Sequence, residues 1–191
     1  MILTDMDSMN LTHHFLIAMP GLNDPNFYHT VTYICSHNEE GAMGIVINKP
    51  LDLMLGEVLE QMDITLEDEV ARDTPIYDGG PVQSDRGFIL HQYDKDWDSS
   101  LKINEQIGIA TSLDILDAIA NGKGPENTFI ALGYAGWSAG QLEQEMQDNI
   151  WLSGPAESHI IFDTPVEQRW NSAASLLGIN IDQLSPDVGH A

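Results

Sequence analysis

Basic residues are scarce in this chain of 191 residues. It holds 7 Lys and Arg against 30 Asp and Glu, which gives a formal net charge of -23. Proteins that bind nucleic acid directly gain affinity by neutralising phosphates with Lys and Arg, and here the few cations are spread along the chain without a basic patch. We therefore expect no direct contact with DNA, and anionic membranes are disfavoured for the same reason.

Cysteine and long hydrophobic runs are also nearly absent. The single cysteine, Cys35, has no second cysteine with which to form an intramolecular disulfide, which fits a reducing compartment. No stretch approaches the ~18 apolar residues of a membrane span, and the N-terminus lacks the basic start and apolar run of a secretory signal. The sequence therefore predicts a cytoplasmic protein that does not associate with membranes.

Length and composition favour a single domain. Hydrophobic residues make up 42% of the chain, enough for a sizeable core, and no repeat or composition shift marks a linker. Residues 1–8 are polar and are predicted to be a flexible extension, with either Met1 or Met9 as the native start. Residues 9–191 are then predicted to form the domain.

Strand patterns outnumber helix patterns. Residues 14–19, 30–36 and 42–48 are apolar or β-branched runs, and the polar residues 37–41 between the last two predict a hairpin. Further short strands are expected at 75–77, 87–91, 107–111, 128–132, 150–152 and 159–162.

About four helices are expected. Leu55, Val58, Leu59 and Met62 follow helical spacing. A second helix runs from Thr111 or Ser112 to Ala120, and a fourth follows the capping box at residues 164–167 and ends at Gly178. A third begins at Ala139, with Ser138 and Gln141 as a capping box and Trp137 packing on Leu142. Together these elements predict an α+β domain with a mixed sheet, the alternative being a three-layer α/β sandwich.

Residues 136–140 read G-W-S-A-G, which matches the G-x-S-x-G pattern of a nucleophile elbow between a strand and a helix. The order Ser138, Asp163, His190 also matches a hydrolase triad. The chain lacks room for the long parallel sheet that carries such elbows, however, and Ser138 has an alternative role as a helix cap. A small hydrolase is therefore the alternative hypothesis, with these three residues as its candidates.

The same segment admits a second interpretation, as a small-residue turn that exposes amides at a helix N-terminus and attracts an anion. Its glycines are equally well explained by positive φ angles and close packing. If a ligand site exists, the turn and the glycine pair before 87–91 are the first places to look. The ligand-binding candidates are Gly79, Gly80, Gly133, Gly136, Trp137, Ser138 and Gly140.

Metal and thiol sites have little support. Asp94, Asp96, Asp98 and Glu105 mimic the oxygen spacing of an EF-hand loop, but the flanks look like strands, so an acidic surface loop is the expected structure. No zinc motif is present, and no cofactor is expected. Cys35 and His37 fall on one face of a strand, where a thiolate-imidazole pair is conceivable and a buried structural cysteine is favoured.

Acidic residues concentrate between Glu57 and Asp73, where Arg72 is the only cation. Such a run is typical of a solvated helix face and loop, and the sharper alternative is a docking surface for a basic protein.

Long blocks of the sequence together carry a family resemblance. They are FLIAMPGLNDPNFYHTVTYICSHNEEGAMGIVINKP at 15–50, YDGGPVQSDRGFILH at 77–91, ALGYAGWSAGQLEQEMQDNIWL at 131–152 and GHA at 189–191. In these blocks the chain resembles the AlgH family of bacterial proteins, from about Met9 to Ala191. The resemblance implies an α+β fold whose mixed sheet curls toward a partial barrel, and the family name implies a transcriptional regulator in alginate production. It places Gly79, Gly80, Gly136, Trp137 and Gln141 in family blocks but supplies no catalytic residues.

Two functions follow from these observations. The first is a binding or regulatory protein without catalytic activity, acting on transcription indirectly through a protein partner or a small ligand that the sequence does not identify. The second is the small hydrolase built on the turn that contains Ser138.

Overall fold

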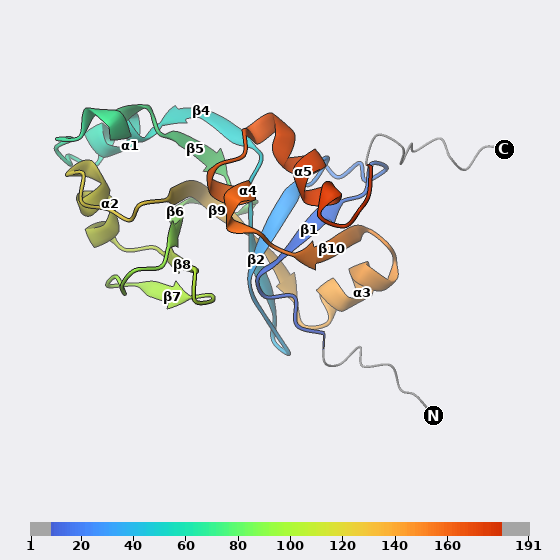
Figure 1. The fold of residues 1–191 in the computed structure, drawn as a ribbon. Coiled ribbons are helices and arrows are strands. Elements are labelled where there is room, and N and C mark those ends of the chain that lie inside the picture. Colours follow the sequence, from blue (N-terminus) through green and yellow to red (C-terminus); the bar gives the residue numbers. More distant parts are fainter. Residues whose placement is uncertain (1–8, 181–191) are drawn as a thin grey trace. The chain divides into compact units, whose positions relative to one another are not determined.

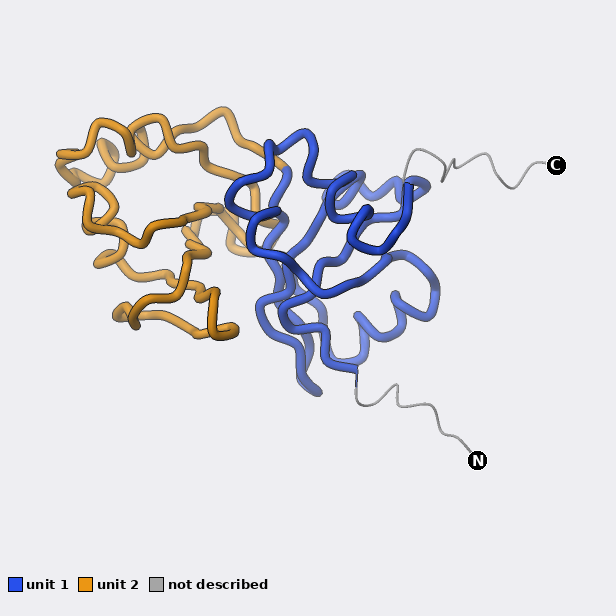
Figure 2. Tube along the Cα trace, in the orientation of Figure 1, with its two compact units in different colours: residues 1–48, 135–191 blue, residues 49–134 orange. Residues whose placement is uncertain are grey.

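The computed structural model describes residues 9–180, which divide into two compact units. Unit 1 comprises residues 1–48 and 135–191, and unit 2 comprises residues 49–134 (Figure 2). Unit 2 is thus inserted between two stretches of unit 1 along the chain. The single domain predicted for residues 9–191 stays a prediction, and the extension predicted at 1–8 lies outside the described residues.

Unit 1 is built on an antiparallel sheet (Figure 1). Its strand order is β10-β1-β2-β3-β9, and each neighbouring pair is antiparallel. The strands are β1 (His14–Ala18), β2 (Val31–Asn38), β3 (Gly41–Val46), β9 (Thr128–Ser138, of which residues 135–138 belong here) and β10 (Trp151–Pro155). Asn38 pairs with Gly41, so β2 and β3 form the expected hairpin.

Unit 2 contains a mixed arrangement of strands. β5 (Pro75–Asp78) pairs in parallel with the first part of β9 and antiparallel with β4 (Pro50–Met54). β6 (Val82–Gln92) pairs antiparallel with β9 and with β8 (Ile107–Ala110), which in turn pairs with β7 (Ser100–Lys102). Antiparallel pairs therefore dominate, as an α+β fold requires, and the three-layer α/β alternative does not apply.

Helices are short and lie within single units. Unit 2 contains α1 (Leu55–Gln61), the 3₁₀ helix η2 (Glu69–Asp73) and α2 (Leu113–Ala120). Unit 1 contains α3 (Gln141–Gln147), α4 (Ser158–Phe162), the 3₁₀ helix η3 (Val166–Gln168) and α5 (Arg169–Ser175). The predicted α+β class is confirmed, and the described residues form five α-helices where about four were expected.

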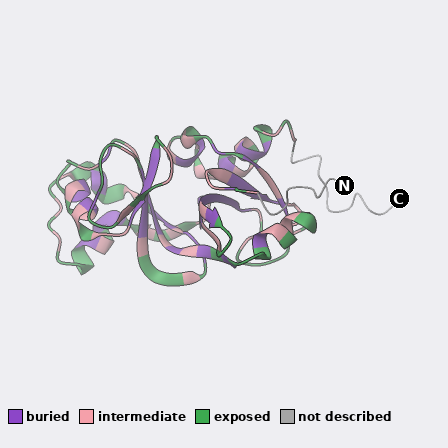
Figure 3. Ribbon diagram, turned by 90° about the horizontal axis from the view of Figure 1, so that it is seen from below, coloured by how far each residue is buried: buried purple, intermediate pink, exposed green. Residues whose placement is uncertain are grey.

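Each unit has its own apolar cluster. In unit 1, Leu16, Ile34, Trp137, Leu142 and Trp151 are buried together. In unit 2, Leu55 and Leu59 of α1 are fully buried and Val58 packs against the same cluster, as the helical spacing predicted. Met62, the fourth residue of the predicted stripe, lies after the end of the helix and is exposed. Figure 3 shows buried residues along the strands and exposed residues along much of the connecting chain. Burial of these side chains is the main stabilising term of each cluster.

The strand predicted at 159–162 is wrong. These residues form α4, in which Ile160 and Ile161 are buried. A short apolar run does not distinguish a strand from a buried helical turn, and here local hydrogen bonds decide. The carbonyl oxygen of His159 accepts the amide hydrogens of Asp163 and Thr164 and is also approached by the hydroxyl of Thr164.

Candidate functional site

Ser138 is held by the side chain of Gln141. The Oε1 atom of Gln141 accepts hydrogen bonds from the Ser138 amide at 3.0 Å and from the Ser138 hydroxyl at 3.2 Å. Ser138 is the last residue of β9, where it pairs with Gly41 of β3. Its hydroxyl proton is therefore directed to an amide oxygen, which is too weak a base to activate it as a nucleophile.

The nucleophile-elbow interpretation is wrong in its geometry. An elbow places its serine on a tight turn between strand and helix, whereas Ser138 lies within the paired strand. Asp163 is an exposed residue at the C-terminal end of α4, and His190 lies outside the described residues. Within residues 9–180 no histidine hydrogen-bonds to Ser138. The triad of Ser138, Asp163 and His190 as a set stays a prediction, because the structure describes only the first two of its members.

The capping prediction for the third helix also needs correction. α3 begins at Gln141, two residues later than expected, and its N-cap is Gly140 with a φ of 77°. Gln141 is therefore the first residue of the helix, and its side chain reaches back to the strand that precedes it. The predicted packing of Trp137 and Leu142 into one apolar cluster is confirmed.

The amide-exposing turn predicted at residues 133–140 is largely a strand. Residues 135–138 pair with β3, with Gly136 opposite Met43 and Trp137 opposite Ala42. The backbone groups on the β3 side of these residues are therefore taken up by the ladder and are not open to an anion. The turn is thus shorter than expected, and the ligand site predicted there stays a prediction.

Gly79, Gly80 and Gly133 come together in unit 2, where their backbones are in close contact. A Cβ atom on Gly133, whose φ is 79°, would lie 2.3 Å from the Gly80 carbonyl oxygen. A Cβ atom on Gly79 would lie 2.4 Å from the Gly133 carbonyl oxygen. The glycines allow β9 and the loop after β5 to approach each other, which is a packing role.

The acidic loop between β6 and β8 does not gather metal ligands. Asp96 accepts a hydrogen bond from the Tyr93 hydroxyl at 2.9 Å, and Glu105 pairs with Lys102 at 3.0 Å. In the part of the chain that the structure describes, no group of three or more Asp, Glu, His or Cys residues is arranged to hold a metal ion. Asp94, Asp96 and Asp98 lie in the loop between β6 and β7, and Glu105 lies in the next loop, between β7 and β8.

His37 and Cys35 lie on β2 but do not form a pair. Burial raises the pKa of the Cys35 thiol, which approaches the carbonyl oxygen of Tyr33. The His37 Nδ1 atom accepts the Leu11 amide hydrogen at 3.0 Å, so the ring proton is on Nε2, which donates to Glu143 Oε1 at 2.6 Å. Both ring nitrogens are occupied, and no thiolate-imidazole pair forms.

A carboxyl group packed into an aromatic cluster was missed by the sequence analysis. Trp151 makes edge contacts with Phe27 at 5.4 Å and with Trp137 at 6.3 Å between ring centroids. Burial beside these rings raises the pKa of Glu145, and the indole N–H groups of both tryptophans act in the opposite direction. The only signal in the sequence was the position of Glu145 three residues after the buried Leu142, on the inward side of α3.

The carboxyl group of Glu145 has incomplete hydrogen bonding. Its Oε2 atom is buried without a well-formed hydrogen bond, and so is the indole Nε1 of Trp151. A carboxyl group in this setting is costly to ionise, because desolvation penalises its charge. Of the ligand-binding candidates, Trp137 thus lies beside the buried carboxyl group of Glu145.

No helix among residues 9–180 is long and apolar enough to cross a membrane.

Comparisons with known proteins assign the family. The AlgH-like family profile matches residues 15–182. A UPF0301 protein of Thioalkalivibrio sulfidiphilus is 56% identical over 184 residues, covering 96% of this chain and 98% of its own. A UPF0301 protein of Nitrosospira multiformis is 52% identical over 186 residues, covering 97% of this chain and 100% of its own.

Solved structures agree with this result. The solution structure of the AlgH protein from Pseudomonas aeruginosa is similar with a TM-score of 0.80 and 52% identity, covering 96% of this chain and 97% of that one. A Corynebacterium diphtheriae protein has a TM-score of 0.72 at 16% identity, covering 97% and 99% of the two chains, which shows a shared fold. The blocks at 15–50, 77–91 and 131–152, the α+β fold and these matches together show that the chain belongs to the AlgH-like family of bacterial proteins.

Proposed function

We propose that this AlgH-family chain is a cytoplasmic binding protein without catalytic activity, which regulates transcription indirectly through a protein partner or a small ligand. The observation that carries the proposal is the hydrogen bond from the Ser138 hydroxyl to Gln141 Oε1. It argues against Ser138 as a nucleophile, because a nucleophilic serine needs a base at the position that the Gln141 amide oxygen takes.

The basic residues support an indirect role. Lys49 pairs with Asp78, Arg72 with Glu69 and Lys102 with Glu105. The buried Arg169 donates to backbone carbonyl groups. With most of its few cations engaged in this way, the chain has little positive charge to offer to phosphates.

Labelling with a fluorophosphonate probe tests the absence of hydrolase activity. We expect no label on Ser138 of the native protein, and the same result for the Ser138→Ala variant. Ser175, which is exposed, provides the matched control. Labelling of the wild type that is lost in S138A and kept in Ser175→Ala would instead establish a reactive serine and remove the proposal.

A second measurement addresses the partner. Affinity purification of the tagged protein from cells, followed by mass spectrometry of retained proteins and metabolites, is expected to yield the same bound species for the wild type and S138A. A species that accumulates only on S138A would indicate a trapped substrate and contradict a role in binding alone.

A further inference from the structure

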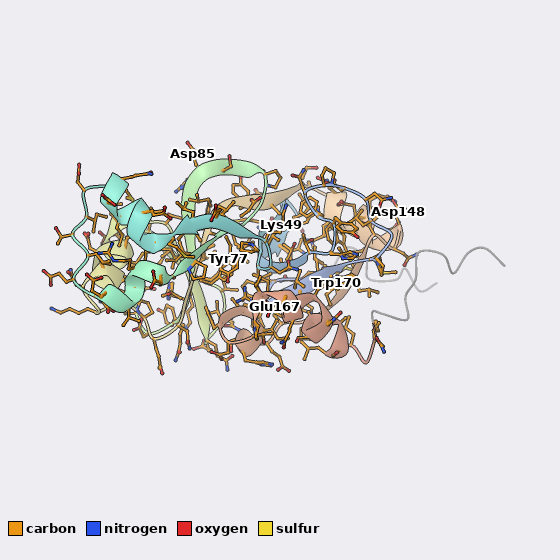
Figure 4. All side chains as sticks on the ribbon, turned by 90° about the horizontal axis from the view of Figure 1, so that it is seen from above. Lys49, Tyr77, Asp85, Asp148, Glu167 and Trp170 are labelled. Carbon is orange, nitrogen blue, oxygen red and sulfur yellow. The ribbon has the colours of Figure 1, made fainter. Side chains whose placement is uncertain are left out.

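Three aromatic rings form a continuous stack on unit 1. The imidazole of His29 lies between the rings of Tyr28 and Trp170, with centroid distances of 3.8 and 4.0 Å and interplanar angles of 14° and 16°. Tyr28 and His29 precede β2, whereas Trp170, which is labelled in Figure 4, belongs to α5. The stack is therefore assembled from two parts of the chain that are distant in sequence.

The middle ring is fixed at a cost in backbone energy. His29 has a φ of 54°, a left-handed conformation that is strained for a residue with a Cβ atom. The Asn48 side chain holds it by donating to the His29 carbonyl oxygen at 2.9 Å, and the indole of Trp170 is fixed by donating to the Ala18 carbonyl oxygen at 3.1 Å. The stack is preformed rather than adaptable.

The outer end of the stack is open. Tyr28 is 53% exposed, whereas His29 and Trp170 are half-buried. Among the described residues, no other ring or cation is recorded against Tyr28. Tyr28 therefore adds little to the core and presents an aromatic face to a partner.

The charge of unit 1 determines which partner fits. Arg169 is the only Lys or Arg in residues 1–48 and 135–191, and it is only 6% exposed. Acidic residues are distributed over the same unit, and Asp24, whose carbonyl oxygen accepts the Tyr28 amide hydrogen at 2.8 Å, is exposed. The described acidic residues of this unit are Asp24, Glu39, Glu40, Glu143, Glu145, Asp148, Glu157, Asp163 and Glu167.

We propose that the open face of Tyr28 binds an arginine side chain of a basic partner protein, with the guanidinium stacked on the phenol ring. The proposal rests on the proposed function and deepens it by giving the partner's chemistry. A guanidinium is planar and weakly hydrated and carries a delocalised charge, so it stacks on an aromatic face better than an ammonium does. The anionic surface of unit 1 attracts such a partner over a distance.

Labelled hexa-arginine and hexa-lysine peptides test this inference by fluorescence anisotropy at physiological ionic strength. We expect Tyr28→Ala to weaken binding of the arginine peptide by about threefold or more, which is the loss of one exposed cation-π contact. Binding of the lysine peptide should change less, and Tyr28→Phe should restore the arginine affinity because the ring is kept. Leu176→Ala, at a side chain of the same unit that is 38% exposed, is the matched control and should leave both affinities unchanged.

Equal affinity of the arginine peptide for the wild type and Y28A would overturn the inference, and so would an equal loss for both peptides. A parallel titration with single-stranded oligoadenylate tests a nucleobase as the occupant, and binding that depends on Tyr28 would also overturn it. Because Tyr28 is exposed, Y28A should melt as the wild type does. None of these outcomes affects the labelling of Ser138, so this inference and the proposed function fail separately.

Discussion

The Nε2 atom of His37 donates to Glu143 Oε1 over 2.6 Å, and this bond joins β2 to α3. The other ring nitrogen accepts the Leu11 amide hydrogen, so the tautomer of His37 is fixed by its surroundings. The His37 side chain is 1% exposed and that of Glu143 24% exposed. His37, which the sequence suggested as a partner of Cys35, thus connects β2 with Leu11 and with α3.

Two substitutions of Glu143 should lower the free energy of unfolding by different amounts. Glu143→Gln keeps an acceptor and loses only the charge-assisted part of the bond, a cost of about 1 kcal/mol in the free energy of unfolding. Glu143→Ala leaves the buried Nε2 hydrogen without a partner and should cost about 2 kcal/mol. Urea denaturation followed by circular dichroism measures both. Glu39→Gln, at an exposed residue, is the control, and equal stability of all four proteins would contradict the assignment.

Gly133 should tolerate alanine poorly. A Cβ atom there would clash with the Gly80 carbonyl oxygen, and the φ of 79° adds strain, so Gly133→Ala should lower the free energy of unfolding by more than ~2 kcal/mol. Gly140 has a φ of 77° but open space around it, so Gly140→Ala should cost about 1 kcal/mol. Gly87→Ala has neither problem and should have almost no effect. Thermal melting should rank the three variants in this order, and a G133A protein as stable as G87A would refute the packing role.

Glu145 should make stability fall as the pH rises. Because burial raises its pKa in the folded state, the folded protein binds a proton more tightly than the unfolded chain does between the ordinary glutamate pKa and the raised one. Ionisation across that window therefore costs stability. Glu145→Gln cannot ionise, so it should gain stability relative to the wild type at neutral pH and lose that advantage in acid.

Denaturation curves of wild type and E145Q between pH 3.5 and pH 7.5 measure this difference. Glu40→Gln, at an exposed glutamate on the β2–β3 hairpin, should show no comparable trend. A difference between wild type and E145Q that does not change with pH would show that the Glu145 carboxyl is not perturbed.

Much of the fold was predictable because its patterns are local. The β-branched runs of β2 and β3 and the helical spacing of Leu55 and Leu59 depend on neighbours within a few residues. The strand predicted at 159–162 failed because its apolar run is equally compatible with a buried helical turn. β4 and β7 were missed, since their pairing partners are supplied by other segments and they are only five and three residues long.

The site was less predictable because contacts distant in sequence define it. The G-W-S-A-G segment has the composition of an elbow or a cap, but pairing of residues 135–138 with β3 places Ser138 at the end of a strand. Of the predicted capping box only the bond from the Ser138 amide to Gln141 Oε1 forms, and the N-cap is Gly140. The same long-range assembly places Glu145 between two tryptophans and Trp170 beside His29. No spacing rule connects residues that far apart in the chain.

The central claim is that this anionic chain acts through a protein or small ligand and does not contact DNA itself. Fluorescence anisotropy tests it most directly: labelled duplex DNA is titrated with the purified protein at about 50 mM and 200 mM salt. We expect no measurable binding at either concentration, since a net charge of -23 repels the phosphate backbone. Tight binding that weakens steeply at the higher salt concentration would contradict it.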